Sequence, residues 1–110
     1  MFVEGLEIMS ELRTHKRVRV NMKVAYRDNG QAYKMGRVYD ISRGGMYIQT
    51  GNALEVDGYV IASLDAEAFG KVIWVQGRVI WKTRTGMAIK FTNTDEKGLK
   101  NILSYRSVPF

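Results

Sequence analysis

The sequence predicts an all-β fold, a six-stranded antiparallel β-barrel followed by one C-terminal α-helix. Six short apolar runs are separated by turn-forming residues, and the clearest helical pattern comes near the end of the chain. Strands that follow one another so directly favour antiparallel pairing. Closing the sheet into a barrel also removes the exposed edges that an open sheet presents.

Residues 1–12 are expected to be a separate N-terminal segment, and the barrel domain with its helix is expected to span residues 13–110. The first segment is compatible with a short helix, because its apolar residues Phe2, Leu6, Met9 and Leu12 lie near helical spacing. The first strand, residues 18–26, alternates apolar and polar side chains. Its apolar face consists of Val18, Val20, Met22, Val24 and Tyr26.

The remaining strands are predicted at residues 33–41, 45–50, 59–64, 71–82 and 86–91, with a turn at Asp28-Asn29-Gly30 and a polar connection at 51–58. In the strand at 71–82, one face carries Ile73, Val75, Val79 and Trp81. We expect this face to lie in the core. Trp74 and Ile80 fall on the opposite face, so we expect the C-terminal helix to cover them, or else a partner protein or second subunit.

The C-terminal helix is predicted within residues 92–106. Thr94 is the expected N-cap, and Asp95 and Glu96 suit the positive end of the helix dipole. The apolar stripe consists of Leu99, Ile102 and Leu103. Gly98 weakens the helix by about 1 kcal/mol relative to alanine, so this helix should depend on packing.

Composition limits the kinds of site that the chain can build. Its 110 residues suit one domain with a single core. Cysteine is absent and His15 is the only histidine, so disulfides, thiolate chemistry and multi-histidine metal sites are excluded. We expect no metal, no cofactor and no membrane insertion, since no segment approaches the length of a membrane span. The lack of cysteine fits a reducing environment, and we expect a cytoplasmic protein.

Positive charge is concentrated in one part of the chain. The formal net charge is +6, but residues 13–43 hold nine lysines and arginines against Asp28 and Asp40. A local basic field attracts an anion, such as a nucleic acid, a phosphorylated small molecule or a membrane surface. Part of this charge could equally be an ordinary solvated face.

Two motifs in this basic region carry the candidate chemistry. Arg13 and Arg17 are four residues apart, and arginine grips phosphate or the acceptor edge of guanine and stacks on rings. The stretch Asp40-Ile-Ser-Arg-Gly-Gly45 offers a carboxylate that can accept N–H bonds from guanine. Ser42 adds a hydroxyl, and Gly44 and Gly45 let backbone approach a ligand closely. Each motif alone is also compatible with a plain strand end or turn.

Taken together, the two motifs resemble the PilZ domain, the bacterial receptor module for the second messenger cyclic di-GMP. The pattern is R-x-x-x-R, two strands joined by a turn, and then D-x-S-x-x-G, with "GRVIW" at 77–81 and "GMAIKF" at 86–91 similar to the closing strands of the family. The resemblance covers about residues 11–105. One departure is Leu12, which stands where many members carry a further arginine.

The resemblance implies a split-barrel receptor without catalytic activity. The implied ligand-binding residues are Arg13, Arg17, Asp40, Ser42 and Gly45. Nearby candidates for secondary contacts are His15, Arg19, Arg43, Gly44 and Trp81. It also implies that the N-terminal arginine segment orders over the ligand and signals to a partner protein. Because of Leu12, the sequence leaves open whether one cyclic di-GMP or an intercalated pair binds. For Trp81, burial in the core is the competing expectation.

Three other functions remain open from the sequence. The chain could be a PilZ-like adaptor that acts mainly by protein contact, with weak or no nucleotide binding, for which Trp74 and Ile80 would supply the surface. It could be a single-stranded nucleic-acid-binding barrel that stacks bases on Tyr26, Tyr33, Tyr39 and Tyr47. An enzyme is the least favoured, since the closest carboxylate pair, Asp65 and Glu67, lies in an expected hairpin connection.

Overall fold

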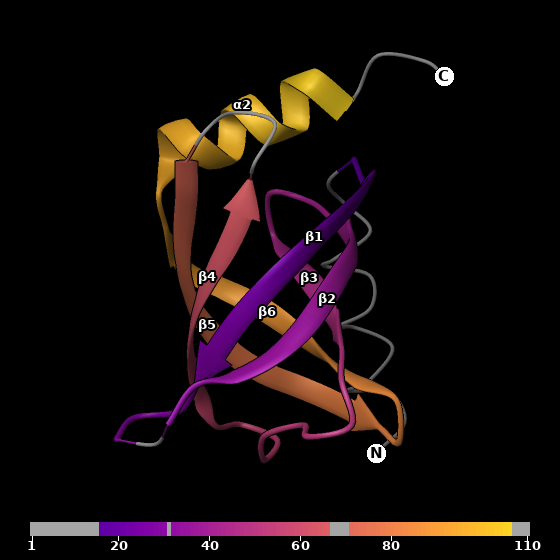
Figure 1. Ribbon diagram of the computed structural model, residues 1–110, viewed down its shortest axis with the longest axis vertical. Coiled ribbons are helices and arrows are strands. Elements are labelled where there is room, and N and C mark those ends of the chain that lie inside the picture. The colour runs from indigo at the N-terminus through magenta and orange to yellow at the C-terminus, as the bar shows by residue number, and fades with distance from the viewer. Residues whose placement is uncertain (1–15, 31, 67–70, 107–110) are drawn as a thin grey trace.

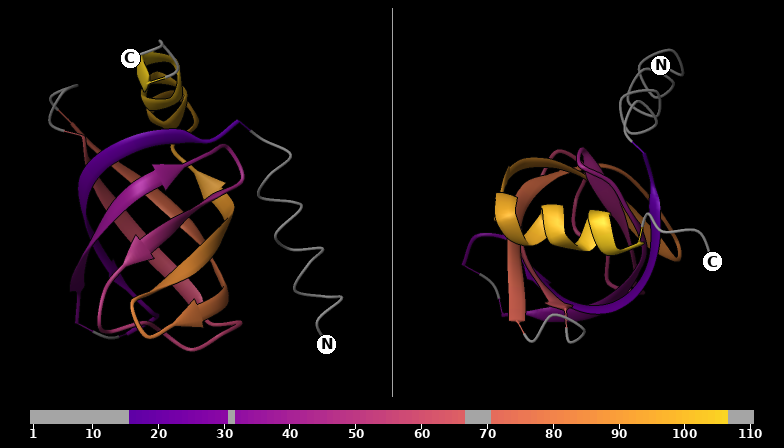
Figure 2. Two further views of the ribbon diagram at one scale, coloured as in Figure 1. Left: turned by 90° about the vertical axis from the view of Figure 1, so that its right-hand side faces the viewer. Right: turned by 90° about the horizontal axis from the view of Figure 1, so that it is seen from above.

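The strands form a closed antiparallel barrel in the computed structural model, which describes residues 16–30, 32–66 and 71–106. The barrel order is β1-β2-β3-β6-β5-β4, and α2 lies across one end (Figures 1 and 2). The elements are β1 (Val18–Arg27), β2 (Lys34–Ile41), β3 (Gly45–Gln49), β4 (Tyr59–Ala66), β5 (Lys71–Thr83), β6 (Gly86–Thr94) and α2 (Glu96–Arg106). The predicted fold class is confirmed. The helix considered for residues 1–12 lies outside the described residues.

The barrel core follows from the period-two alternation of the strands. All five apolar residues predicted on the inner face of β1 are buried, while Arg19, Asn21 and Lys23 between them are exposed. At the far end of β1, the Tyr26 hydroxyl lies 2.7 Å from the Thr50 hydroxyl and donates to the Asn52 carbonyl oxygen at 2.7 Å. These bonds attach the connection after β3 to the core. That connection is also less polar than predicted, because Leu54 is buried in the core.

The helix α2 closes one end of the barrel. Both its position and its N-cap differ from the prediction. Leu99 and Ile102 belong to the core cluster, so the apolar stripe of the helix faces the barrel interior. The helix therefore does not cover the outer face of β5, where the Trp74 side chain is 43% exposed. The N-cap is Asp95, not Thr94, since Asp95 Oδ1 accepts from the Gly98 N–H at 3.1 Å.

A glycine in α2 is explained by how closely the helix packs. A Cβ atom at Gly98 would lie 2.9 Å from the Ile73 side chain and 2.9 Å from Asp95 Oδ2. The helix could not sit this deep in the barrel with a larger residue at that position. The cost in helix propensity is therefore offset by burial of the apolar stripe.

A β-bulge in β5 corrects the prediction that Trp81 lies in the core. Val79 pairs with Ile89, but Trp81 pairs with the next residue of β6, Ala88, so Ile80 is an extra residue. One extra residue reverses the side on which the following side chains lie. Val79 is fully buried, whereas Trp81 lies half-buried on the outer surface of the barrel.

Candidate ligand-binding site

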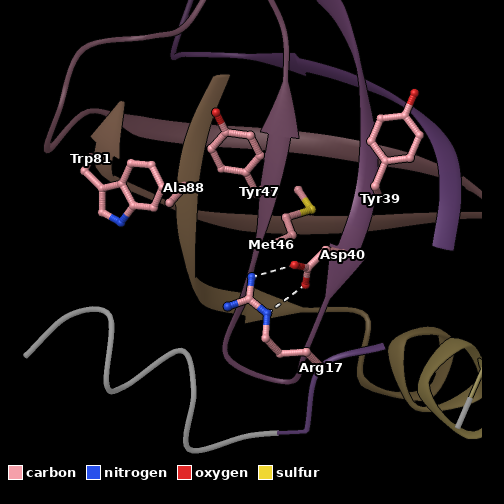
Figure 3. A pocket seen from close by; sticks show the side chains of 7 residues that line it. All are labelled: Arg17, Tyr39, Asp40, Met46, Tyr47, Trp81 and Ala88. Carbon is pink, nitrogen blue, oxygen red and sulfur yellow. Dashed lines mark hydrogen bonds and ion pairs between the residues drawn. The ribbon is translucent and has the colours of Figure 1, made fainter. Parts of the chain in front are cut away.

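A pocket on the outer surface of the barrel brings polar and aromatic groups together from four neighbouring strands and the residue before β1. Its volume is about 400 Å³, within the range of small-molecule sites. The pocket is shown in Figure 3, and its lining residues are Arg17, Tyr39, Asp40, Met46, Tyr47, Trp81 and Ala88.

Arg17 and Asp40 form a two-bond ion pair at the polar edge of the pocket. Arg17 Nε donates to Asp40 Oδ1 at 2.8 Å, and Arg17 Nη2 donates to Asp40 Oδ2 at 2.9 Å (Figure 3). The two side chains are 37% and 41% exposed, so solvent weakens the pair. β1 and β2 hold it in register, because Arg19 pairs with Asp40 across the sheet. The carboxylate thus already accepts two parallel N–H bonds.

The turn between β2 and β3 fixes the backbone that follows Asp40. The Ser42 N–H donates to the Gly45 carbonyl at 2.8 Å, and the Ser42 hydroxyl accepts from the Gly44 N–H at 3.1 Å. The Gly44 carbonyl in turn accepts from the Phe91 N–H at 2.9 Å, which ties the turn to β6. Ser42 is 2% exposed, so its side chain builds the turn beneath the pocket edge.

The apolar part of the pocket is a shallow depression lined by two aromatic rings, which we call the aromatic depression. Tyr47 and Trp81 both pair with Ala88, from opposite sides, and their ring centroids are 5.6 Å apart, so the rings contact each other. Ala88 allows this close approach because its side chain is small. The Tyr47 hydroxyl bonds Thr83 Oγ1 at 2.9 Å, which fixes the orientation of the ring.

This combination suits a flat, polar, anionic ligand. Aromatic faces stack on a planar ring system, arginine pairs with phosphate, and a carboxylate accepts from N–H groups on a base edge. Among the described residues, the Trp81 Nε1–H is buried without a hydrogen-bond partner. Among the described residues, no group of three or more acidic, histidine or cysteine side chains is placed to hold a metal ion.

The structure gathers only some of the predicted site residues at the pocket. Arg17, Asp40 and Trp81 line it, while Ser42, Gly44 and Gly45 form the adjoining turn. Arg19 is exposed on β1 outside the lining, Arg43 lies on a separate groove beside α2, and Arg13 and His15 lie outside the described residues.

Four lining residues were not predicted as ligand-binding residues. They are Tyr39, Met46, Tyr47 and Ala88. The only sequence signal for any of them was the aromatic character of the two tyrosines, which was considered for nucleic-acid stacking.

Comparisons with known proteins agree with this architecture. A family model described as the PilZ domain matches residues 11–106. The PilZ domain of YcgR from Escherichia coli, in a structure with c-di-GMP, has a TM-score of 0.70 at 15% identity, over 84% of this chain and 89% of that chain. The PilZ domain of CeSA from a cellulose-synthesizing bacterium has a TM-score of 0.65 at 15% identity, over 84% and 95% of the two chains.

A longer protein also shares the fold. The inhibitor of motility MotI/DgrA from Bacillus subtilis has a TM-score of 0.70 at 14% identity and matches 86% of this chain. The match covers 49% of the MotI chain, so the present chain spans about half its length. No curated protein matches the sequence significantly. Because the family model covers nearly the whole sequence, and the barrel has the same fold as these PilZ domains, the chain belongs to the PilZ domain family.

Proposed function

We propose that the protein is a cyclic di-GMP receptor whose ligand occupies the pocket beside Arg17 and Asp40. The observation that carries this proposal is the way in which Asp40 is held, with both carboxylate oxygens accepting parallel N–H bonds at 2.8 and 2.9 Å. The Watson–Crick edge of guanine presents the same pair of parallel donors. A guanine can therefore take the place of the Arg17 guanidinium at Asp40, and Arg17 is then free to pair with a phosphate.

The aromatic depression supports the same ligand. When the edge of a guanine binds Asp40, the flat face of the base lies near Tyr47 and Trp81. Stacking on these rings then replaces contact with water. Family membership and the nucleotide named for the YcgR domain agree with this assignment. The contact of Arg13 with the ligand, the ordering of the N-terminal segment and the signal to a partner protein are further parts of the proposal.

The second candidate is a PilZ-like adaptor that works mainly by protein contact. The observation that favours it is the exposed apolar surface of β5, where Val72 is 62% exposed and Trp74 is 43% exposed. In the single-stranded nucleic-acid alternative, four tyrosines were considered for base stacking. Tyr26 cannot stack on a base, because it is buried in the core. PilZ domains are receptor or adaptor modules, so we do not propose an enzymatic reaction.

Isothermal titration calorimetry with cyclic di-GMP, GTP and a short single-stranded oligonucleotide tests the proposal. We expect saturable binding of cyclic di-GMP alone, which an Asp40→Asn substitution weakens. The matched control is Asp57→Asn, which makes the same change of charge at an exposed residue outside the pocket lining. Binding that is unaffected by Asp40→Asn, or equally affected by the control, would contradict this site. Absence of nucleotide binding would favour the adaptor.

A further inference from the structure

A second groove, on a different part of the surface, has four cations and one carboxylate among the described residues of its lining. It runs between α2 and the segments that lead into β1 and β3, at the end of the barrel that α2 closes. Its volume is about 660 Å³. We call it the basic groove and define it by the cations Lys16, Arg43, Lys97 and Lys100 and the leucines Leu99 and Leu103.

The side chains of the four cations of the basic groove have no partner among the described residues. All four are exposed, and none of these side chains makes an ion pair or hydrogen bond within the part of the chain that the structure describes. Of the described lining residues, Glu96 alone carries a carboxylate. Three separate segments thus place like charges together at an energetic cost, and an anionic partner would remove that cost.

The shape and the floor of the basic groove discriminate between classes of anionic partner. Its floor is apolar, because Leu99 is 4% exposed and Leu103 is partly buried against the core. Single-strand binders use aromatic side chains to stack bases, and none of the described residues that line this groove is aromatic. A membrane surface is flat, whereas these cations surround a concavity. An acidic polypeptide segment with apolar side chains satisfies both the charge and the floor.

We propose that the basic groove is the docking site for an acidic segment of a partner protein, with at least one apolar side chain of that segment resting on Leu103. Carboxylates of the segment pair with Lys97 and Lys100 on α2 and with Arg43 on the β2–β3 turn. This inference is independent of the nucleotide pocket, since none of the residues that line the basic groove lines that pocket.

Fluorescence anisotropy tests the proposal in the absence of nucleotide. The probe is a short fluorescein-labelled peptide that repeats Glu-Glu-Leu-Ser, and the comparison peptide has serine in place of leucine. The groove variant is Lys97→Glu/Lys100→Glu, which keeps good helix formers and places acids in the N-terminal half of α2. The control is Lys23→Glu/Arg84→Glu, which changes the net charge equally at exposed sites outside the groove.

We expect the groove variant to bind the leucine peptide about tenfold more weakly than the unchanged protein, and the control to change its affinity less than about threefold. The serine peptide should also bind more weakly. Equal weakening in both variants would mean diffuse attraction and would overturn the proposal, as would equal affinity for the two peptides. A groove that binds oligothymidylate or phosphatidylglycerol vesicles more tightly than the peptide would overturn it in favour of those partners.

Discussion

Replacing Arg17 and Asp40 singly and together by alanine tests whether ligand binding breaks their ion pair. In the free protein the pair consists of two bonds of 2.8 and 2.9 Å between side chains that are 37% and 41% exposed. An exposed pair of this geometry contributes about 0.5–1 kcal/mol. Each charged contact to the ligand should contribute about 1.5–3 kcal/mol.

The expected affinities follow from these two magnitudes. Each single variant loses one ligand contact but no longer has an ion pair to break, so its binding should weaken by about 1–2 kcal/mol, or roughly 5- to 30-fold. The double variant loses both contacts and avoids the cost of breaking the pair only once. Its loss should therefore exceed the sum of the single losses by about 0.5–1 kcal/mol, or roughly two- to fivefold.

Titration calorimetry of the four proteins with cyclic di-GMP measures this difference, and thermal unfolding checks that each variant remains folded. Losses that add within about 0.3 kcal/mol would refute the exchange of partners at Asp40. A double loss smaller than the sum would mean that the ligand strengthens the contact between Arg17 and Asp40. Single variants with unchanged affinity would refute the site itself.

Five further predictions concern the pocket, the barrel core and the basic groove. In a Trp74→Phe protein the one remaining tryptophan is Trp81, and cyclic di-GMP should change its fluorescence emission; unchanged emission would place the base elsewhere. Tyr26→Phe should lower the free energy of unfolding by about 1–3 kcal/mol in urea titrations, because the buried Thr50 hydroxyl loses a partner. Burial raises the pKa of Tyr26 above its ordinary 10.0, an effect that the Thr50 hydrogen bond opposes, so the stability of the unchanged protein should fall as the pH rises above 10.0, and this component should be absent from Tyr26→Phe. Gly77→Ala should destabilise the barrel by about 1–3 kcal/mol in the same assay, because its Cβ would press on a backbone carbonyl of β6, and a neutral result would contradict this close approach. Saturating cyclic di-GMP should weaken binding of the acidic peptide to the basic groove a few-fold, measured by anisotropy.

The strands could be predicted from the sequence because alternate apolar residues in them face a single core. The inner face of β1 agrees with the alternation at every position from Val18 to Tyr26. The position of α2 was harder to predict, because an apolar stripe shows that one face of a helix is buried but not which part of the protein buries it. The helix was predicted, but it does not cover Trp74, which is exposed.

The candidate site was only partly predictable because it depends on register as well as on motifs. Arg17 and Asp40 were predicted because their two motifs together resemble the PilZ domain, whereas neither motif alone indicated a binding site. The aromatic depression could not, because the bulge at Ile80 reverses the orientation of Trp81 and has no signature in the sequence. Ala88 contributes by being small between two rings, and such a role becomes visible only when the pairing of β3, β5 and β6 is known.

The expected effect of cyclic di-GMP on the basic groove, which rests on the proposed function, follows from the covalent links between the two sites. Lys16 of the groove directly precedes Arg17 of the pocket, and Arg43 of the groove lies three residues after Asp40. We predict that Lys16 shifts when the ligand draws Arg17 away from Asp40, because the two residues are adjacent in the chain. The two phosphates of the ligand also lower the positive potential that attracts acidic groups. Both effects weaken binding of the peptide, and linkage requires the peptide to weaken binding of the nucleotide by the same factor. Calorimetry with saturating peptide therefore provides an independent measurement of that factor, and unchanged or tighter peptide binding with nucleotide would refute the coupling.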